Sequence, residues 1–131
     1  MILLAASVSA CKVHTSVVIR NESGETIEVL SEQTREATTI ADGNAAAIDY
    51  TVGRITIHVS SGATWNYDVL AVPDLYKSKF MEKKEGIFET RMRIYLLIDD
   101  KGRIYLLPPG GVPKDKAYAA DQPEGFPLVP E

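Results

Sequence analysis

The chain has 131 residues, the length of one domain of a globular protein. Hydrophobic residues make up 45 % and charged residues 24 %, which is the usual balance of such a protein. The net charge of −4 argues against a general nucleic-acid-binding protein, because those proteins usually carry an excess of basic residues. A chain with one Cys cannot form an internal disulfide, and a chain of this length buries enough surface to fold without disulfides or a metal.

The first eleven residues are an apolar or small, uncharged run that ends at Cys11. Residues 2–10 would span only about 14 Å as a helix, against the ~30 Å of a bilayer core, so they are too short for a transmembrane helix. Such a run is typical either of a short buried strand or of the apolar part of a secretory signal.

The segment Val8-Ser9-Ala10-Cys11 resembles the bacterial lipoprotein signal motif, in which small residues precede a lipidated Cys. The resemblance implies that the peptide before Cys11 is removed and that Cys11 becomes the first residue of the mature chain. Lys12 stands where an Asp would favour retention at the inner membrane of enteric bacteria. The resemblance therefore predicts a cell-envelope protein that a lipid anchor holds at the outer membrane, facing the periplasm. No Lys or Arg precedes the apolar run, unlike the usual signal, and the alternative is a first β-strand with an incidental Cys.

From Lys12 to Leu107, apolar residues recur mainly at every second position, which is typical of β-strands with one buried face. Strands are expected at about 13–20, 27–29, 38–40, 46–52, 54–59 and 64–72, separated by turns rich in Gly, Asn, Asp and Ser. The first two strands flank Asn21-Glu22-Ser23-Gly24 and are expected to pair as a hairpin. This spacing predicts an all-β or β-rich protein with an antiparallel β-sandwich or small barrel over residues 12–107.

Residues 73–86 interrupt the alternation. Pro73-Asp74 is typical of a helix start, a weak helical spacing of apolar residues follows, and Gly86 would end the helix. We expect either a short helix docked on the sheet or a long loop. The segment also contains a candidate contact surface for a protein partner or for anionic lipid headgroups. This surface consists of Lys77, Lys79, Phe80, Met81, Lys83 and Lys84. The alternative is that these residues form a solvent-exposed helix face.

The clearest hairpin lies at 87–107, because Arg-Ile-Tyr-Leu-Leu occurs at 93–97 and again at 103–107. Gly102 is expected to supply the positive φ of its turn. Both arms carry consecutive apolar residues, so one face should meet the core and the other should be covered.

The tail, residues 108–131, holds six of the seven prolines and is expected to be extended. It is predicted to pack on the domain, with Phe126, Leu128 and Val129 covering the outer face of the hairpin. The sequence PEGFPLVP at 123–130 resembles the tails of small uncharacterised bacterial envelope proteins, a resemblance that implies no activity.

Few residues are candidates for chemistry. His58 and Asp68, with Ser60 nearby, suggest a hydrolase. His14, together with His58 and Asp68, suggests a metal site. The alternative is that both histidines are solvated strand residues, because the sequence has no Gly-x-Ser-x-Gly, His-x-His or Cys-x-x-Cys motif. The sequence predicts no cofactor.

The preferred function is a non-enzymatic accessory or binding domain on an envelope membrane. It would bind an envelope protein through sheet edges, loop tips or the 73–86 segment. The alternatives are a small hydrolase or metal-dependent enzyme that uses His58 and Asp68, and an inhibitor of a periplasmic enzyme. The sequence predicts no nucleic-acid partner and leaves the oligomeric state open.

Overall fold

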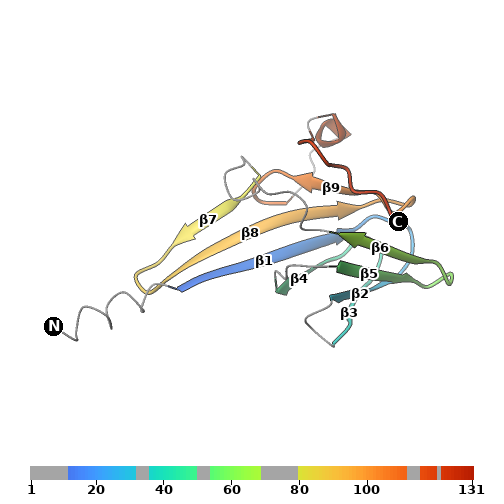
Figure 1. Ribbon diagram of the computed structural model, residues 1–131, viewed down its shortest axis with the longest axis horizontal. Helices are drawn as coiled ribbons and strands as arrows, with labels where there is room; N and C mark the ends of the chain where they lie inside the picture. The colour runs from blue at the N-terminus through green and yellow to red at the C-terminus, as the bar shows by residue number, and fades with distance from the viewer. Residues whose placement is uncertain (1–11, 32–35, 50–53, 69–79, 112–115, 121) are drawn as a thin grey trace.

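The computed structural model describes residues 12–31, 36–49, 54–68, 80–111, 116–120 and 122–131. In this part of the chain the protein is β-rich, and mostly antiparallel strands form two sheets (Figure 1), which confirms the predicted β-sandwich class. The same residues contain one short 3-10 helix, η2 (Lys116–Ala119). They contain no helix that is long and apolar enough to cross a membrane.

The first sheet is built around a long parallel pair of strands. Its order is β4 (Ala45–Asp49), β1 (Lys12–Asn21), β8 (Glu89–Ile98) and β7 (Glu82–Glu85), with β9 (Ile104–Leu107) also paired with β8. β1 and β8 run parallel from the Lys12–Glu89 pair to the Asn21–Ile98 pair. β7 pairs with the first half of β8 and β9 with its second half, so both lie on the side of β8 away from β1.

The second sheet is antiparallel throughout its described pairings. Its order is β3 (Thr38–Ile40), β2 (Ile27–Ser31), β5 (Arg54–Val59) and β6 (Thr64–Asp68). In β5, Ile55, Ile57 and Val59 are buried while Arg54 and His58 are exposed. The alternation predicted for this strand is therefore confirmed.

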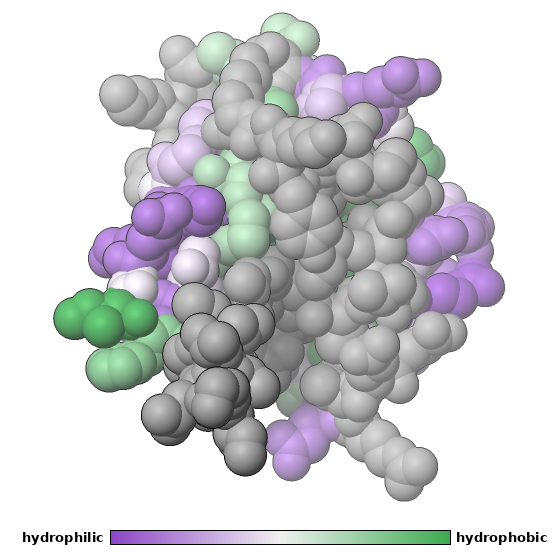
Figure 2. Space-filling view, turned by 60° about the vertical axis from the view of Figure 1, so that its left-hand side comes forward, coloured by the Kyte–Doolittle hydropathy of each residue, from purple (hydrophilic) through white to green (hydrophobic). Residues whose placement is uncertain are grey.

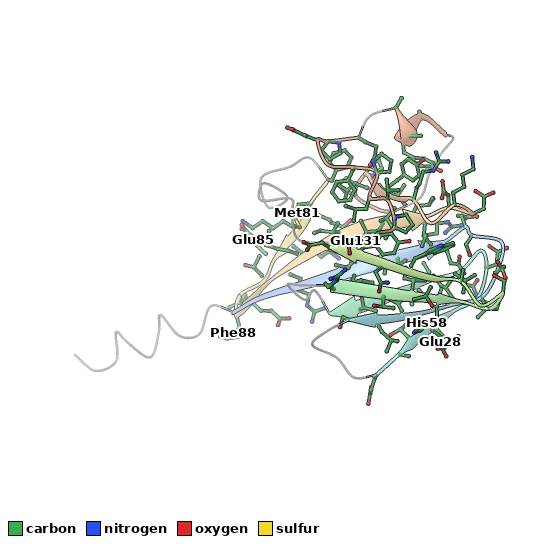
Figure 3. The ribbon with its side chains drawn as sticks, turned by 45° about the vertical axis from the view of Figure 1, so that its right-hand side comes forward. Glu28, His58, Met81, Glu85, Phe88 and Glu131 are labelled. Atoms are coloured by element: carbon green, nitrogen blue, oxygen red, sulfur yellow. The ribbon has the colours of Figure 1, made fainter. Side chains whose placement is uncertain are left out.

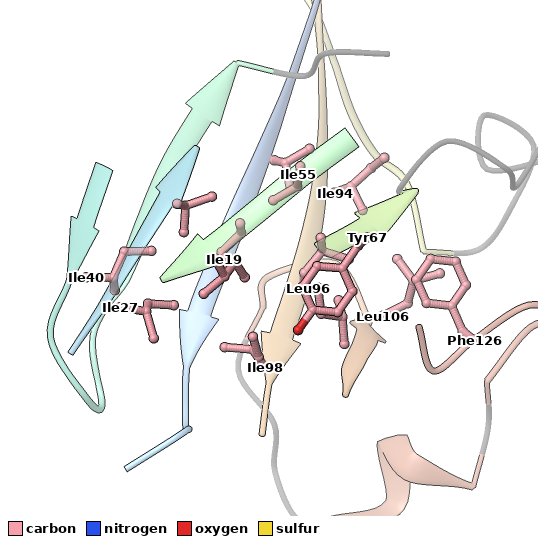
Figure 4. Packing of buried hydrophobic residues seen from close by; sticks show 14 of the residues in the cluster. Ile19, Ile27, Ile40, Ile55, Tyr67, Ile94, Leu96, Ile98, Leu106 and Phe126 are labelled. Carbon is pink, nitrogen blue, oxygen red and sulfur yellow. The ribbon is translucent and has the colours of Figure 1, made fainter. Parts of the chain in front are cut away.

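The core lies between the sheets and receives side chains from both (Figure 4). Ile19 and Leu96 come from the first sheet, Ile27 and Ile57 from the second, and each is at most 2 % exposed. Tyr67 ties the layers together, because its hydroxyl donates a hydrogen bond of 2.6 Å to the Gly102 carbonyl. Burial, with a smaller effect of the Asp99 carboxylate, raises the pKa of Tyr67 well above its ordinary value, so this hydroxyl stays a donor.

The segment after β1 does not form the predicted hairpin turn. β1 pairs with β4 in one sheet, and β2 pairs with β3 in the other. Strands β1 to β4 are therefore one long hairpin folded over at residues 21–25 and 41–44. The ladder continues across the fold, where Asn21 N donates to Asn44 O at 2.8 Å and Gly43 N donates to Asn21 O at 2.7 Å. The alternation that we used to pair β1 with β2 is equally compatible with this arrangement.

Asn21 explains why the chain folds over here. It is completely buried, and its side-chain nitrogen donates to the carbonyls of Glu25 at 2.6 Å and Ile40 at 2.9 Å. Its side-chain oxygen accepts from the backbone N–H and the hydroxyl of Ser23 at 2.9 and 2.6 Å. One amide therefore satisfies backbone groups that a bend takes out of the ladder. We call residues 21–25 the Asn21 corner.

The helix expected over 73–86 is wrong for its described part. Residues 82–85 form β7, Phe80 is 6 % exposed in the core, and Met81 packs against that core. Residues 73–79, which include Lys77 and Lys79, lie outside the described residues. The weak helical spacing is outweighed because β7 supplies hydrogen-bond partners to the first half of β8, which would otherwise be an open edge.

The tail closes the edge of the sandwich at β9. Leu128 and Ile104 exchange two backbone hydrogen bonds, at 2.9 and 2.8 Å. The side-chain amide of Gln122 accepts from Leu106 N and donates to Leu106 O, both at 2.9 Å, as a neighbouring strand would. Glu131 N reaches the second sheet and donates to Asn66 O at 3.0 Å. The tail thus connects both layers.

The tail's apolar residues are not where the sequence suggested. Phe126 is 9 % exposed and belongs to the interior core, Leu128 packs against that core, and Val129 is 65 % exposed. The outer face of the β8–β9 hairpin has a second, smaller cluster instead, consisting of Leu97, Tyr105 and Leu107 with Tyr95 and Tyr118 packed against it. Tyr118 of η2 therefore occupies the place that we expected Phe126 to take.

Candidate functional site

The end of the molecule at which β1 begins carries a projecting arm. β7, the β7–β8 turn and the first half of β8, residues 82–93, extend away from the second sheet (Figure 1). None of these twelve residues is buried, which distinguishes them from the second half of β8. We call residues 82–93 the arm.

The tip of the arm exposes two large apolar side chains. Ile87 is 90 % exposed and Phe88 is 73 % exposed, in a turn closed by a hydrogen bond of 2.8 Å from Gly86 N to Glu89 O. Phe88 lies at the end of the arm, on the side of the molecule away from the second sheet (Figure 3). On the face that Figure 2 shows, hydrophobic side chains project at one edge beside strongly hydrophilic ones. We call Ile87 and Phe88 the apolar tip.

Charged side chains lie behind the tip. Residues 82–93 contain four basic and three acidic residues, in a chain whose net charge is −4. Lys83 Nζ lies 3.0 Å from Glu85 Oε1, and Arg91 Nε donates to Glu89 Oε1 at 2.8 Å. Lys83 and Lys84 are exposed, as a contact surface requires, whereas Phe80 and Met81 of the same predicted cluster pack on the core.

Cys11 itself lies outside the described residues, but its covalent neighbour does not. Lys12 is the first residue of β1 and pairs with Glu89, next to the apolar tip. Consecutive Cα atoms are about 3.8 Å apart, so a group attached to Cys11 is tethered to this end of the molecule.

A pocket of about 750 Å³ lies at the opposite end of β1 and β8. The Asn21 corner, the turn after β8, β9 and η2 surround it. Its lining consists of Glu22, Ser23, Gly24, Leu97, Asp99, Asp100, Arg103, Tyr105, Tyr118 and Ala119.

Asp99 organises one wall of the pocket. One of its carboxylate oxygens accepts from Lys101 N at 3.0 Å and Arg103 N at 2.9 Å, and the other accepts from Arg103 Nε at 2.8 Å. This bond and the charge of Asp99 raise the pKa of Arg103. Gly102 has the expected positive φ, +77°, and a Cβ there would lie 2.8 Å from the Trp65 ring. The tight turn predicted at 99–102 is confirmed.

Two tyrosines form another part of the lining. The Tyr105 and Tyr118 rings pack edge to face with centroids 5.4 Å apart, and the Arg103 guanidinium lies 5.9 Å from the centroid of Tyr105. Burial raises the pKa of Tyr118, and the neighbouring Tyr105 and Asp99 raise it further. Aromatic rings and the exposed Asp100 in one pocket lining suit a cationic or aromatic group of a binding partner.

The structure does not bring His58 and Asp68 together. His58 pairs with Thr64 and Glu28, and its Nδ1 lies 3.2 Å from Thr64 Oγ1, whereas Asp68 pairs with Arg54. Four residues along a strand separate the two positions by about 13 Å, and both side chains are exposed.

The metal site that the sequence suggested with His14 is not assembled either. His14 belongs to β1 of the other sheet, opposite Arg91, and its side chain is outside the described set. Among the described side chains, no group of three His, Cys, Asp or Glu residues could hold a metal ion.

Two features of the candidate sites were missed at the sequence level. Ile87 and Phe88 were assigned to the first strand of the 87–107 hairpin. An apolar pair directly after Gly86 and among charged residues is itself a signal for an exposed turn. Tyr118 had no signal beyond being an aromatic residue in a polar segment. No protein-family model, curated protein or solved structure matches the chain significantly.

Proposed function

We propose that the protein is a non-enzymatic accessory or binding domain, tethered to a bacterial envelope membrane by a lipid on Cys11. The observation that supports this is the position of Lys12, the residue that follows Cys11, relative to the pocket. The chain enters β1 at the arm, and the pocket lies at the other end of the same strand. From Lys12 to Asn21 a strand rises about 30 Å. A tether at Cys11 therefore leaves the pocket facing away from the membrane, available to a partner in the periplasm.

The lining of the pocket supports a protein partner. Tyr and Arg are enriched in protein–protein interfaces, and here Tyr105, Tyr118 and Arg103 are held in place by packing and by Asp99. Asp100 is exposed at the rim, where a carboxylate attracts a basic side chain of an approaching protein. The proposed partner is an envelope protein that places a Lys or Arg against Asp100 at the rim of the pocket.

Reversal of the charge of Asp100 tests this proposal. The Asp100→Lys protein should bind the partner at least about tenfold more weakly, because the substitution places like charges at the rim. The partner is first captured by crosslinking from membranes with the wild-type protein, then purified for titration. Asp68→Lys is the matched control, since Asp68 is an exposed carboxylate of the second sheet and does not line the pocket. Equal affinities for the two variants, or no captured protein, would contradict the proposal.

A further inference from the structure

The exposure of the apolar tip has no explanation in the folding of the domain. Ile87 and Phe88 are adjacent in the chain and 90 % and 73 % exposed, whereas the core residues of both sheets are almost completely buried. Keeping two adjacent large apolar side chains in water is unfavourable, so a contact that buries both of them is favoured. We infer that the apolar tip inserts into the interfacial region of an anionic lipid bilayer.

The shape of the tip favours a lipid surface over a protein. The turn between Gly86 and Glu89 is narrow and convex, and its two apolar residues are far too few for a stable protein interface of roughly 1,200–2,000 Å². A lipid interface has no fixed shape and accepts a narrow wedge of apolar side chains. Such a wedge buries Ile87 and Phe88 while the charged residues behind them stay at the headgroup level.

The charges behind the tip indicate anionic headgroups. Lys84 and Arg91 face each other across the β7–β8 ladder, two residue pairs from the tip. Like charges at directly opposed positions destabilise an antiparallel pair, and a phosphate group nearby offsets this repulsion. The ion pairs Lys83–Glu85 and Arg91–Glu89 moderate the positive charge, so the apolar contact carries most of the expected attraction.

The position of the tip agrees with the proposed tether. Glu89, the residue after Phe88, pairs with Lys12, which follows Cys11. A lipid on Cys11 would hold the tip against the bilayer, so weak insertion is sufficient. This inference rests on the proposed function for its biological setting, but the insertion itself does not require the lipid and is tested without it.

The test uses the full chain with Cys11→Ser, titrated with vesicles of phosphatidylethanolamine and phosphatidylglycerol. In this background Ile87→Ser/Phe88→Ser should reduce vesicle binding at least about tenfold, because two apolar side chains no longer leave water. Val129→Ser is the matched control, since Val129 is 65 % exposed away from the arm and its replacement should leave binding unchanged. Both tip positions are exposed turn residues, so the variants keep the fold, which thermal unfolding verifies.

The apolar residues 2–10 are present in every one of these chains, so only the difference between variants reports on the tip. A Phe88→Trp version should show a blue shift of the added fluorescence with vesicles, after subtraction of the Trp65 signal of the parent. Equal binding with and without the apolar tip overturns the inference. A blue shift that depends on protein concentration in the absence of lipid also overturns it, because the tip then contacts a second copy of the chain. If the tip variant binds vesicles more weakly but Cys11 carries no lipid, the proposed tether is wrong and the inferred insertion of the tip is still supported.

Discussion

Replacement of Asn21 by Ala should lower the free energy of unfolding by about 3 kcal/mol, one of the largest single-residue effects in this protein. The substitution removes the donors to the Glu25 and Ile40 carbonyls and the acceptor for Ser23. Because Asn21 is completely buried, water cannot replace these partners without opening the corner. Urea unfolding of the wild type and the variant measures the difference.

Asn21→Asp separates the role of the side-chain amide from that of its size. The Asp side chain keeps the acceptor for Ser23, but it loses both donors and places a carboxylate against two carbonyls, so we expect a loss of stability at least as large. Asn44→Ala is the matched control, because Asn44 lies in the other bend, residues 41–44, with an exposed side chain, and its effect should stay within about 0.5 kcal/mol. If Asn21→Ala and Asn44→Ala are equally stable, the backbone bonds alone hold the corner.

Phe126→Ala should also destabilise the protein by about 3 kcal/mol, as expected for the loss of a buried aromatic side chain. Phe126 is 9 % exposed and packs in the core that both sheets share, although it lies near the end of a proline-rich tail. The cavity left by its removal cannot collapse easily, since the Leu128–Ile104 and Gln122–Leu106 hydrogen bonds hold the tail on both sides.

The control for this prediction comes from the same tail. Val129→Ala changes a side chain that is 65 % exposed and should alter stability by less than about 0.5 kcal/mol. Unfolding monitored by tryptophan fluorescence suits the comparison, because Trp65 packs against the same core. A Phe126→Ala protein as stable as the Val129→Ala protein would show that the tail is an appendage and not part of the domain.

Side-chain alternation predicted the described strands other than β7, but not their partners. Ile55, Ile57 and Val59 fixed the buried face of β5, and the repeated Arg-Ile-Tyr-Leu-Leu with Gly102 fixed the β8–β9 hairpin. The pairing of β1 with β2 was wrong because a turn-forming sequence does not show whether the next strand returns in the same sheet or enters the opposite one. A buried Asn, which the sequence cannot distinguish from a turn Asn, decides this.

Segments with competing local and tertiary preferences were also misassigned. Residues 82–85 have weak helical spacing, but their backbone groups pair with β8 and gain more from that ladder than from an isolated short helix. The tail posed the opposite difficulty. Phe126 and Leu128 pack as expected but in the interior core, whereas Val129 is exposed, and which face receives Phe126 and which receives Tyr118 depends on the path of a chain without periodicity.

The candidate sites were predictable only in part. Lys83 and Lys84 are exposed as predicted, whereas Phe80 and Met81 of the same predicted surface pack in or against the core. The exposed apolar residues of this region are Ile87 and Phe88 instead. His58 and Asp68 were grouped by their proximity in sequence, whereas strand register places them at opposite ends of a ladder. Strand register and side-chain burial therefore determine which candidate residues come together and which are exposed, and neither can be read from the pattern of a single sequence.

The proposed tether is tested most directly by the intact mass of the protein recovered from bacterial membranes. We predict a chain that begins at Cys11, with residues 1–10 removed and the mass of a lipid added to the cysteine. The Cys11→Ser protein should show no such addition. Recovery of a chain that begins at Met1 and carries an unmodified Cys11 thiol would contradict the tether and the orientation of the pocket derived from it.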